Sequence, residues 1–482
     1  MPPQAQAVLD RISAASLRGH LSFIASDSLE GRFTPSRGLD MAAEYIAAQF
    51  RRAGLEPVGD DEYFQTAEMR ELEPAKTGFE LQIEQGGRVI SIAREDITPR
   101  FHEALDLSAQ IYKASLDDET ALDRLEPEDL RDRILMVKLP EFNGPAATSA
   151  ARRYGRLLTV LRHVKPKLTV MLSLSGMAEL DSTLINTGEQ RFDEQVIVVR
   201  SADVARWYDS QRIGPAPATM SVHLPPAADV PVKVRNVIGL LRGSDPALKG
   251  TYILVTAHYD HLGVTAGGTG HRIFNGANDD GSGTVSVIEI ASALAALEPR
   301  LRRSLVFLTF FGEEEGTLGS LYYARHPVFS IEKTIADVNL EQVGRTDAVG
   351  GVKLSEVTLT GYDYSNLPRV FRAAGAKTGV RVLSDASDGE SFFARSDNAP
   401  LADQGIPAHT FAVAFEFLDY HRVTDVWQKI DYDNMAKVDR MIALGLMALA
   451  QSPEAPKWNE ANPKAAQYLD AWREHRAPHT SQ

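Results

Sequence analysis

The chain has no cysteine among its 482 residues, so disulfide bonds and thiolate metal ligands are excluded. No apolar run approaches the roughly 20 residues that a membrane-spanning helix needs. Basic residues are outnumbered by acidic ones, with 51 Lys and Arg against 65 Asp and Glu. The net charge of −14 argues against nucleic acid and anionic membranes as partners. The first residues lack the basic and apolar regions of a signal peptide, which predicts either that none exists or that the chain begins after its removal.

The composition that remains is typical of a globular protein, with 44% hydrophobic residues. The length exceeds that of a usual single domain, which favours two domains or one domain with an insertion. From residue 232 onward strand-like and helix-like segments alternate, so we predict an α/β fold: a mixed, mainly parallel sheet between layers of helices. We assign residues 1–100 and 232–455 to this domain, 101–231 to a smaller, β-rich inserted domain, and 456–482 to a C-terminal tail.

Polar residues follow four apolar runs of this predicted sheet. The runs are residues 253–257, 305–311, 335–340 and 410–418. The polar residues that follow them include His258 with Asp260, Glu313 with Glu314, Glu341, and Tyr420 with His421. Open α/β sheets bind ligands at the carboxyl ends of their strands. We therefore expect these side chains to meet at one edge of the sheet.

Imidazole and carboxylate groups are the usual ligands of a catalytic zinc ion. Two Zn²⁺ ions carry four positive charges, which Asp279, Glu314, Glu341 and a bridging hydroxide would balance. Each residue alone has an ordinary interpretation: Asp279 as a helix cap, the Glu residues as a solvated turn, His258 as a hydrogen-bonded core histidine. Their joint placement at strand ends favours a site for two metal ions.

Four short motifs stand in order along the chain. They are His258-Tyr259-Asp260, Asn278-Asp279-Asp280-Gly281-Ser282-Gly283, Glu313-Glu314-x-Gly316-x-x-Gly319-Ser320 and Tyr420-His421-x-x-x-Asp425. In order and spacing they resemble the co-catalytic di-zinc aminopeptidases, a family of secreted bacterial metallopeptidases. The resemblance extends to residues 21–38 and 236–263, and residues 101–231 look like the protease-associated domain that many members carry as an insertion. It implies the zinc exopeptidase fold and a periplasmic or secreted location.

The resemblance also implies the metal ligands. Asp279 would bridge the two Zn²⁺ ions, and a cis peptide bond would join it to Asp280. His258 and Glu341 would complete the shell of one ion. The other ion would take Glu314 and His421.

Further residues receive catalytic or supporting roles from the same resemblance. Glu313 would be the general base, and Tyr420 would donate a hydrogen bond to the tetrahedral oxyanion. Asp260 would accept the second imidazole N–H of His258, and Asp425 would orient the region near His421. The substrates would be peptides with a free N-terminus.

One ligand departs from the family pattern, because the family usually has Asp at the position of Glu341. The extra methylene extends the carboxylate by about one carbon–carbon bond. Either the backbone retreats or the coordination changes, so the ion beside Glu341 is the least secure part of the resemblance. His261, in the loop between ligands, receives no role, since loop histidines of this kind are more often incidental.

Three alternatives stay open. The first is a carboxypeptidase or dipeptidase of the glutamate-carboxypeptidase kind, which needs arginines facing the metals; Arg345, Arg381 and Arg395 are candidates by position. The second is a binding module with the peptidase fold and no turnover, which the complete set of ligands disfavours. The third is aminoacyl cyclisation on one zinc ion, disfavoured because both metal shells look complete. The sequence leaves the oligomeric state, the first-residue preference and the physiological peptide open.

Overall fold

The computed structural model describes most of the chain. The described residues are 3–73, 75–101, 103–117, 122, 124–140, 153–154, 156–157, 160–161, 164–173, 184–186, 195–265, 270–384 and 392–476. They fall into two compact units. The first takes its residues from Met1–Ala67, Lys233–Val264 and Gly268–Gln482, and the second from Glu68–Val232.

The first unit contains a mixed, mainly parallel sheet, which confirms the predicted fold class. Its strands are β12 (Ala228–Leu241), β13 (Tyr252–His258), β16 (Ser304–Phe310), β17 (Thr334–Leu340), β20 (Glu356–Leu359), β21 (Arg381–Leu383) and β22 (Ala408–Ala412), with β1 (Glu56–Pro57) and β2 (Phe64–Glu73) at the β12 side. They lie in the order β21-β20-β22-β17-β13-β16-β12-β2. The central strands β16, β13, β17 and β22 are parallel to one another. Their carboxyl ends therefore face the same edge.

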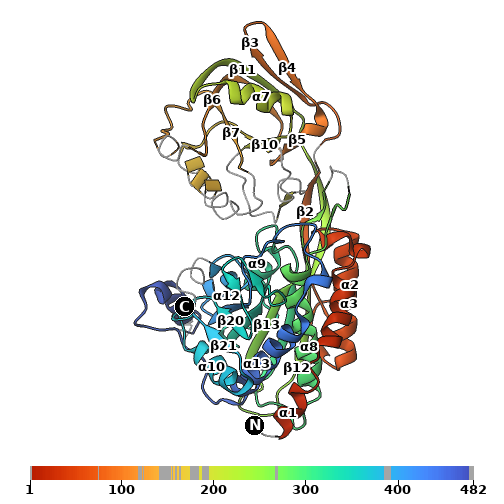
Figure 1. Cartoon of the computed structure of the whole chain (residues 1–482). Coiled ribbons are helices and arrows are strands. Elements are labelled where there is room, and N and C mark those ends of the chain that lie inside the picture. Colours follow the sequence, from red (N-terminus) through yellow and green to blue (C-terminus); the bar gives the residue numbers. More distant parts are fainter. Residues whose placement is uncertain are drawn as a thin grey trace. The chain divides into compact units, whose positions relative to one another are not determined.

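Helices cover both faces of this sheet (Figure 1). One layer is built on α8, which packs against β13, β16 and β17. The other layer packs on Leu254, Leu308 and neighbouring residues through an apolar cluster that includes Tyr323, Leu401 and Trp458. The first layer comprises α1 (Pro3–Leu9), α2 (Ala14–Ile24), α3 (Arg37–Ala53), α8 (Gly283–Ala295), α10 (Leu367–Thr378) and α13 (Tyr432–Gln451). The second comprises α9 (Leu318–Arg325), α12 (Asn398–Asp403) and α14 (Ala466–Arg476).

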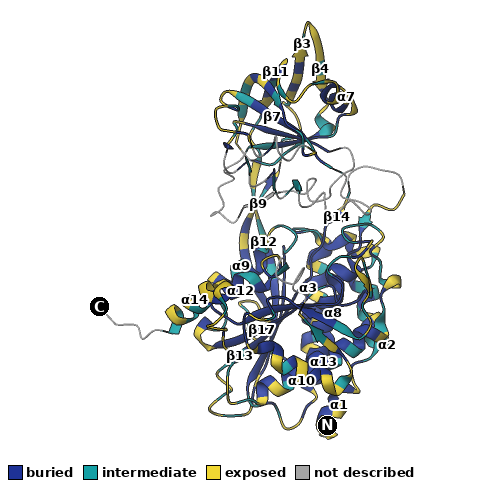
Figure 2. Cartoon of the chain, turned by 60° about the vertical axis from the view of Figure 1, so that its left-hand side comes forward, coloured by how far each residue is buried: buried dark blue, intermediate teal, exposed yellow. Residues whose placement is uncertain are grey.

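The apolar runs predicted from the sequence are buried strands. Every residue of β16 and β17 is buried, and Figure 2 colours the neighbouring central strands dark blue. The fourth strand is shorter than predicted and ends at Ala412 instead of residue 418. The backbone turns there because the N–H groups of Val413 and Ala414 both donate to the carbonyl of Gln342. His421 consequently lies in a loop beyond the strand.

The first unit is completed by short elements. These are η1 (Asp27–Arg32), η4 (Ala277–Ser282), η5 (Ile331–Lys333), η6 (Trp427–Lys429), η7 (Pro463–Ala465) and two hairpins, β14 (Gly263–Val264) with β15 (Ile273–Phe274) and β18 (Asp347–Ala348) with β19 (Gly351–Val352). The segment predicted as a tail belongs to this unit, because Trp458 is buried in its core and donates its indole N–H to the carbonyl of Gly405.

The second unit has a sheet of its own, in the order β4-β3-β11-β6-β7-β8-β10-β5. Its elements are β3 (Glu80–Gln85), β4 (Arg88–Ile92), η2 (Arg94–Asp96), β5 (Ile97–Pro99), β6 (Leu105–Lys113), β7 (Arg133–Lys138), β8 (Thr169–Leu172), β9 (Leu184–Asn186), β10 (Val196–Val199), α7 (Ala202–Ser210) and β11 (Gly214–Leu224). The structure divides at Ala67, well before residue 101, because β3 and β4 pair with each other and β3 with β11. Among the described residues, no helix is both long and apolar enough to cross a bilayer.

Candidate metal centre

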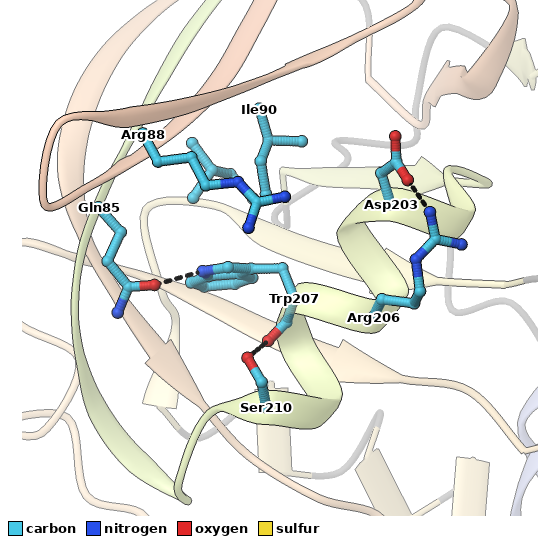
Figure 3. Close-up of a pocket in the computed structure, with 8 residues that line it drawn as sticks. Gln85, Arg88, Ile90, Asp203, Arg206, Trp207 and Ser210 are labelled. Atoms are coloured by element: carbon cyan, nitrogen blue, oxygen red, sulfur yellow. Dashed lines mark hydrogen bonds and ion pairs between the residues drawn. The ribbon is translucent and has the colours of Figure 1, made fainter.

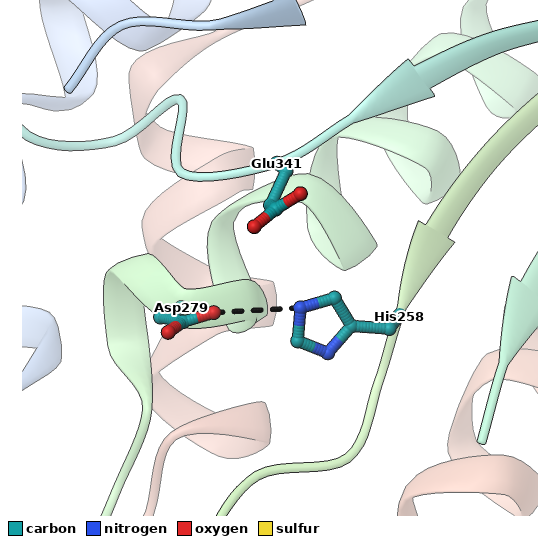
Figure 4. A group of neighbouring side chains, drawn as sticks. All are labelled: His258, Asp279 and Glu341. Atoms are coloured by element: carbon teal, nitrogen blue, oxygen red, sulfur yellow. Dashed lines mark ion pairs between the residues drawn. The ribbon is translucent and has the colours of Figure 1, made fainter. Parts of the chain in front are cut away.

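Three predicted ligands meet at the carboxyl edge of the first unit's sheet. His258 is the last residue of β13, Glu341 follows β17, and Asp279 lies in η4, the turn that leads into α8. Figure 4 shows the three side chains converging, and their ligand atoms lie within 4.8 Å of one another. The Nε2 atom of His258 is 3.4 Å from Oδ1 of Asp279.

A second group of ligand atoms shares Asp279. The Nε2 atom of His421 lies 3.1 Å from Oδ2 of Asp279 and 3.2 Å from Oε2 of Glu314. The structure adds His261, whose Nδ1 lies 2.6 Å from Oε1 of Glu314. The sequence interpretation assigned His261 no role, yet its side chain is fully buried. The sequence around His261 does not indicate its contact with Glu314, because Glu314 follows a different strand.

Asp260 joins two of the loops that carry these side chains. One of its carboxylate oxygens accepts the backbone N–H of Glu313 at 3.1 Å, and the other accepts that of Glu314 at 3.3 Å. Oδ1 of Asp260 is also 3.4 Å from Nδ1 of His258, near the position expected from the resemblance. Asp260 therefore fixes the ends of β13 and β16 relative to each other.

The turn η4 is held by carboxylates on both sides. The bond between Asp279 and Asp280 is cis, as expected. The carboxylate of Asp425 accepts the backbone N–H groups of Asn278 and Asp279, at distances of 2.9 to 3.2 Å. It thus supports the Asp279 turn, and its orienting role near His421 stays a prediction. Asp280 links η4 to the strand end of Glu341, because its Oδ1 accepts the N–H of Gln342 at 3.0 Å.

A buried arginine lies beneath this edge. Arg32 is fully buried, and its guanidinium donates to four backbone carbonyls. The acceptors are Tyr259 at 2.7 Å, Ile24 at 2.6 Å, Asn275 at 2.7 Å and Gly276 at 3.0 Å. Tyr259 directly follows the predicted ligand His258, and Asn275 and Gly276 lie just before Asp279. Arg32, which belongs to the N-terminal segment, therefore connects the backbone next to these two ligands.

The carboxylates differ in their electrostatic surroundings. Burial raises the pKa of Glu313 well above its usual range, and the neighbouring carboxylates of Glu341 and Glu314 add to this effect. Burial would raise the pKa of Glu314 as well, but the charges of His421 and His261 and a hydrogen bond from His261 bring it down to about 2. Burial also raises the pKa of Tyr420, whose ring stacks on His421 with 3.9 Å between centroids, so its hydroxyl stays protonated at neutral pH.

The residues present fit a metal centre. The two groups offer imidazole nitrogens and carboxylate oxygens, the donor set that suits zinc. Within the described part of the chain, neither ring nitrogen of the buried His258 has a hydrogen-bond partner. Buried polar atoms are nearly always satisfied, so an imidazole left in this state, surrounded by carboxylates, matches the environment of a metal ligand.

Two of the arginines that a carboxypeptidase would need are already paired. Arg345 contacts Asp347 and Asp419, with its Nη1 2.9 Å from Oδ2 of Asp419. Arg381 is paired with Glu356. The third candidate, Arg395, lies with its guanidinium carbon 4.8 Å from the ring centre of Phe392.

The second unit has a cavity of about 350 Å³ between β3, β4 and α7 (Figure 3). Arg88 lies above the ring of Trp207, whose indole N–H donates to Oε1 of Gln85 at 2.7 Å. Arg206 is paired with Asp203, the only carboxylate among the lining residues. The residues that line it include no histidine.

The sequence match falls on the unit that carries the metal centre. Residues 236–445 match the family described as Peptidase family M28. They form an M28 domain. The match includes each of the predicted ligands, from His258 to His421.

Relatives of the M28 domain include named peptidases. Aminopeptidase YwaD of Bacillus subtilis (strain 168) is 26% identical over 239 residues, which cover 48% of this chain and 48% of that protein. A probable zinc metalloprotease of Pyricularia oryzae is 33% identical over 150 residues, or 31% of this chain and 27% of that protein. The chain thus spans about half, or less, of the length of these curated relatives.

Solved structures share the fold over nearly the whole chain. An aminopeptidase from Aneurinibacillus sp. strain AM-1 has a TM-score of 0.59 at 17% identity, covering 95% of this chain and 97% of that one. BSAP, a zinc aminopeptidase from Bacillus subtilis, has a TM-score of 0.59 at 19% identity, covering 90% and 94%. At these identities the likeness establishes the fold, and the activity rests on the site.

Proposed function

We propose that the protein is a zinc-dependent aminopeptidase that removes the first residue of peptides. The observation that carries this proposal is the sharing of Asp279 between two groups of ligand atoms, with Glu313 beside them. A carboxylate between two such groups is suited to bridging two Zn²⁺ ions. The named aminopeptidases and zinc metalloproteases among the relatives support the same activity and metal. A periplasmic or secreted location is part of the proposal.

His258 and Glu341 would hold one ion, Glu314 and His421 the other, and Asp279 both. When bound, zinc supplies Lewis acidity toward the substrate carbonyl and makes a bound water more acidic. The structural support for this assignment is geometric: the Nε2 atoms of both histidines lie within 3.4 Å of opposite oxygens of Asp279.

Glu313 would act as the general base and then as the general acid. Its Oε2 lies 3.9 Å from Nε2 of His258, and its backbone is fixed by Asp260. It would take a proton from the attacking water and return it to the leaving amine, which becomes the new N-terminus. Tyr420, kept protonated by burial, would donate its hydroxyl to the oxyanion.

The rival that keeps the same ligands is a carboxypeptidase or dipeptidase. It needs a cation for the terminal carboxylate of its substrate. The pairing of Arg345 with two carboxylates, and of Arg381 with Glu356, leaves Arg395 as the remaining candidate among the three. The rival therefore depends on Arg395, whose charge acts on the hydroxyl of Tyr420 beside the metal centre.

The test is hydrolysis of a panel of aminoacyl-4-nitroanilides by zinc-loaded protein, with the best substrate repeated in N-acetylated form. We expect cleavage of the free amine and none of the acetylated substrate. Glu313→Gln should lower kcat by about 10²- to 10⁴-fold, the usual contribution of a general base, without loss of bound zinc. Arg395→Ala, a matched control for the rival, should leave KM unchanged.

Other outcomes would contradict the proposal. Cleavage of N-acetylated peptides from the carboxyl end, with KM raised by Arg395→Ala, would establish the rival. A protein that binds two zinc ions and cleaves neither type of substrate would be a binding module. Full activity of Glu313→Gln would remove Glu313 from the assigned role.

A further inference from the structure

His261 is a buried imidazole beside the metal centre to which the residue-by-residue comparison with the di-zinc family gives no role. Its side chain is fully buried, and its ring stands at 76° to that of His421, with 5.7 Å between the centroids. Nδ1 lies 2.6 Å from Oε1 of Glu314. The other oxygen of Glu314, Oε2, is the one that faces His421, at 3.2 Å. One carboxylate oxygen of Glu314 therefore accepts a hydrogen bond, and the other faces the proposed ligands.

The position of this imidazole is fixed by its surroundings. The backbone N–H of His261 donates to the carbonyl of Arg32 at 3.2 Å, which anchors the start of the side chain. A β-carbon on Gly276 would lie 2.4 Å from Cγ of His261, so the ring occupies space that only glycine leaves open. Gly276 has φ of 56°, a conformation that glycine adopts without strain. The loop before Asp279 is therefore shaped around this ring.

The direction of the hydrogen bond follows from the acceptor. An ionised carboxylate can only accept, so Nδ1 of His261 carries the proton and donates it to Oε1. A charge-assisted bond of this length removes one of the two oxygens of Glu314 from competition for a metal. It also fixes the carboxylate plane, so that Oε2 points toward His421.

We propose that His261 is a positioning residue that holds Glu314 in the one-oxygen ligand geometry and thereby tightens the metal position formed by Asp279, Glu314 and His421. This inference rests on the proposed two-metal function. Outer partners of metal ligands typically contribute on the order of 10- to 100-fold in metal affinity. The other position, formed by His258, Asp279 and Glu341, has no contact with His261 among the ligand groups of the described residues and should be unaffected.

Metal binding itself provides the test. Metal-depleted full-length protein is titrated with Zn²⁺ by calorimetry, and the Co²⁺ form is followed by its absorption spectrum. His261→Leu and His261→Gln remove the donor near Nδ1, whereas His261→Asn places an amide N–H close to it. His271→Leu is the matched control, because this histidine also lies between β13 and η4 but has a side chain that is 42% exposed.

For the wild type we expect two zinc ions per chain. In His261→Leu and His261→Gln, one of the two should bind about 10- to 100-fold more weakly, with a changed Co²⁺ spectrum, while the other keeps its affinity. His261→Asn should restore most of the loss, and His271→Leu should behave as wild type. Circular dichroism identifies any variant that does not fold, and the Gln variant substitutes for Leu in that case.

The results that would contradict this inference differ from those that would contradict the proposed function. Unchanged binding of both ions by the folded Leu and Gln variants would overturn the positioning role and leave the proposed function standing. Equal loss in the Asn, Leu and Gln variants would make the imidazole itself a ligand and would also overturn the proposal. A wild-type protein that binds no zinc would end the proposed function together with this inference.

Discussion

The carboxylate of Asp260 accepts the backbone N–H of Glu313 at 3.1 Å, across the gap between two neighbouring strand ends. Asp260 lies two residues beyond His258, the last residue of β13, and Glu313 follows β16. This hydrogen bond therefore sets the distance between a proposed ligand and the proposed base. The other carboxylate oxygen of Asp260 accepts the backbone N–H of Glu314. One carboxylate outside the metal site thus places three side chains within it.

Metal removal should destabilise the first unit. The carboxylates of Asp279, Glu313, Glu314 and Glu341 lie close together, and without a cation they repel one another. An ion held at about 1,000 times its dissociation constant stabilises the folded state by roughly 4 kcal/mol. We expect EDTA to lower Tm by at least about 5 °C, and added Zn²⁺ to restore it. Differential scanning calorimetry measures both.

Asp279→Asn is the control for this experiment. It removes the carboxylate common to both ligand groups, so its Tm should respond little to EDTA. Equal melting of the wild type with and without EDTA would contradict the clustered-carboxylate interpretation.

Shortening Glu341 should weaken the ion beside His258. The Glu side chain brings its oxygen within 4.8 Å of the ligand atoms of His258 and Asp279 (Figure 4). Glu341→Asp withdraws the carboxylate by about 1.5 Å, well beyond the roughly 0.2 Å that a metal–ligand distance tolerates. We expect bound zinc, measured by inductively coupled plasma mass spectrometry after dialysis, to fall from two ions to about one. Retention of both would mean that the backbone adjusts to the residue usual in the family.

Much of this centre could be predicted from the sequence because its ligands follow buried strands. Apolar runs indicate strands, and the carboxyl ends of parallel strands lie at the same edge of a sheet regardless of the connecting loops. His258, Glu314 and Glu341 could therefore be identified. The predicted strand before His421 was too long, because β22 ends at Ala412. His421 reaches the site from the loop that follows this strand.

His261 and Arg32 could not be predicted because their contacts are with residues far away in the sequence. Arg32 binds four carbonyl oxygens, which every residue possesses, so no partner is visible in the sequence. His261 depends on the missing β-carbon of Gly276, a steric relation that appears only after folding. The division at Ala67 has the same origin: the strand pairing of β3 with β11 joins residues far apart in the chain.

Replacing Arg32 should cost the first unit much of its stability. Arg32→Met keeps the apolar volume but removes the donor to four carbonyls, of which only that of Gly276 keeps another, the N–H of Gly281. Each unsatisfied buried polar group costs about 1–3 kcal/mol. We expect the free energy of unfolding, from urea titration, to fall by at least about 3 kcal/mol. Arg32→Lys should recover only part of this, since an ammonium cannot reach all four oxygens. Arg51→Met, at an exposed pair with Glu62, is the control and should change little.

Acid should destabilise the fold through His409, a buried histidine that is not one of the proposed ligands. Burial lowers its pKa from 6.5 to about 4, while its Nδ1 donates to the carbonyl of Thr360 at 2.8 Å and its Nε2 accepts from the hydroxyl of Ser365 at 2.7 Å. Between pH 6.5 and 4 the unfolded chain binds a proton that the folded chain does not. Stability must therefore fall as pH decreases through this window, by about 3 kcal/mol in total.

The measurement that isolates this effect compares the wild type with His409→Gln, which keeps an acceptor for Ser365 but cannot titrate. Both proteins are unfolded with urea at pH values from 7 to 4. The variant starts less stable, because it loses the bond to Thr360, and its free energy of unfolding should decline less steeply over the window. Parallel curves would show that His409 is protonated in the folded state at the same pH as in the unfolded chain, which a buried neutral imidazole with both nitrogens satisfied does not allow.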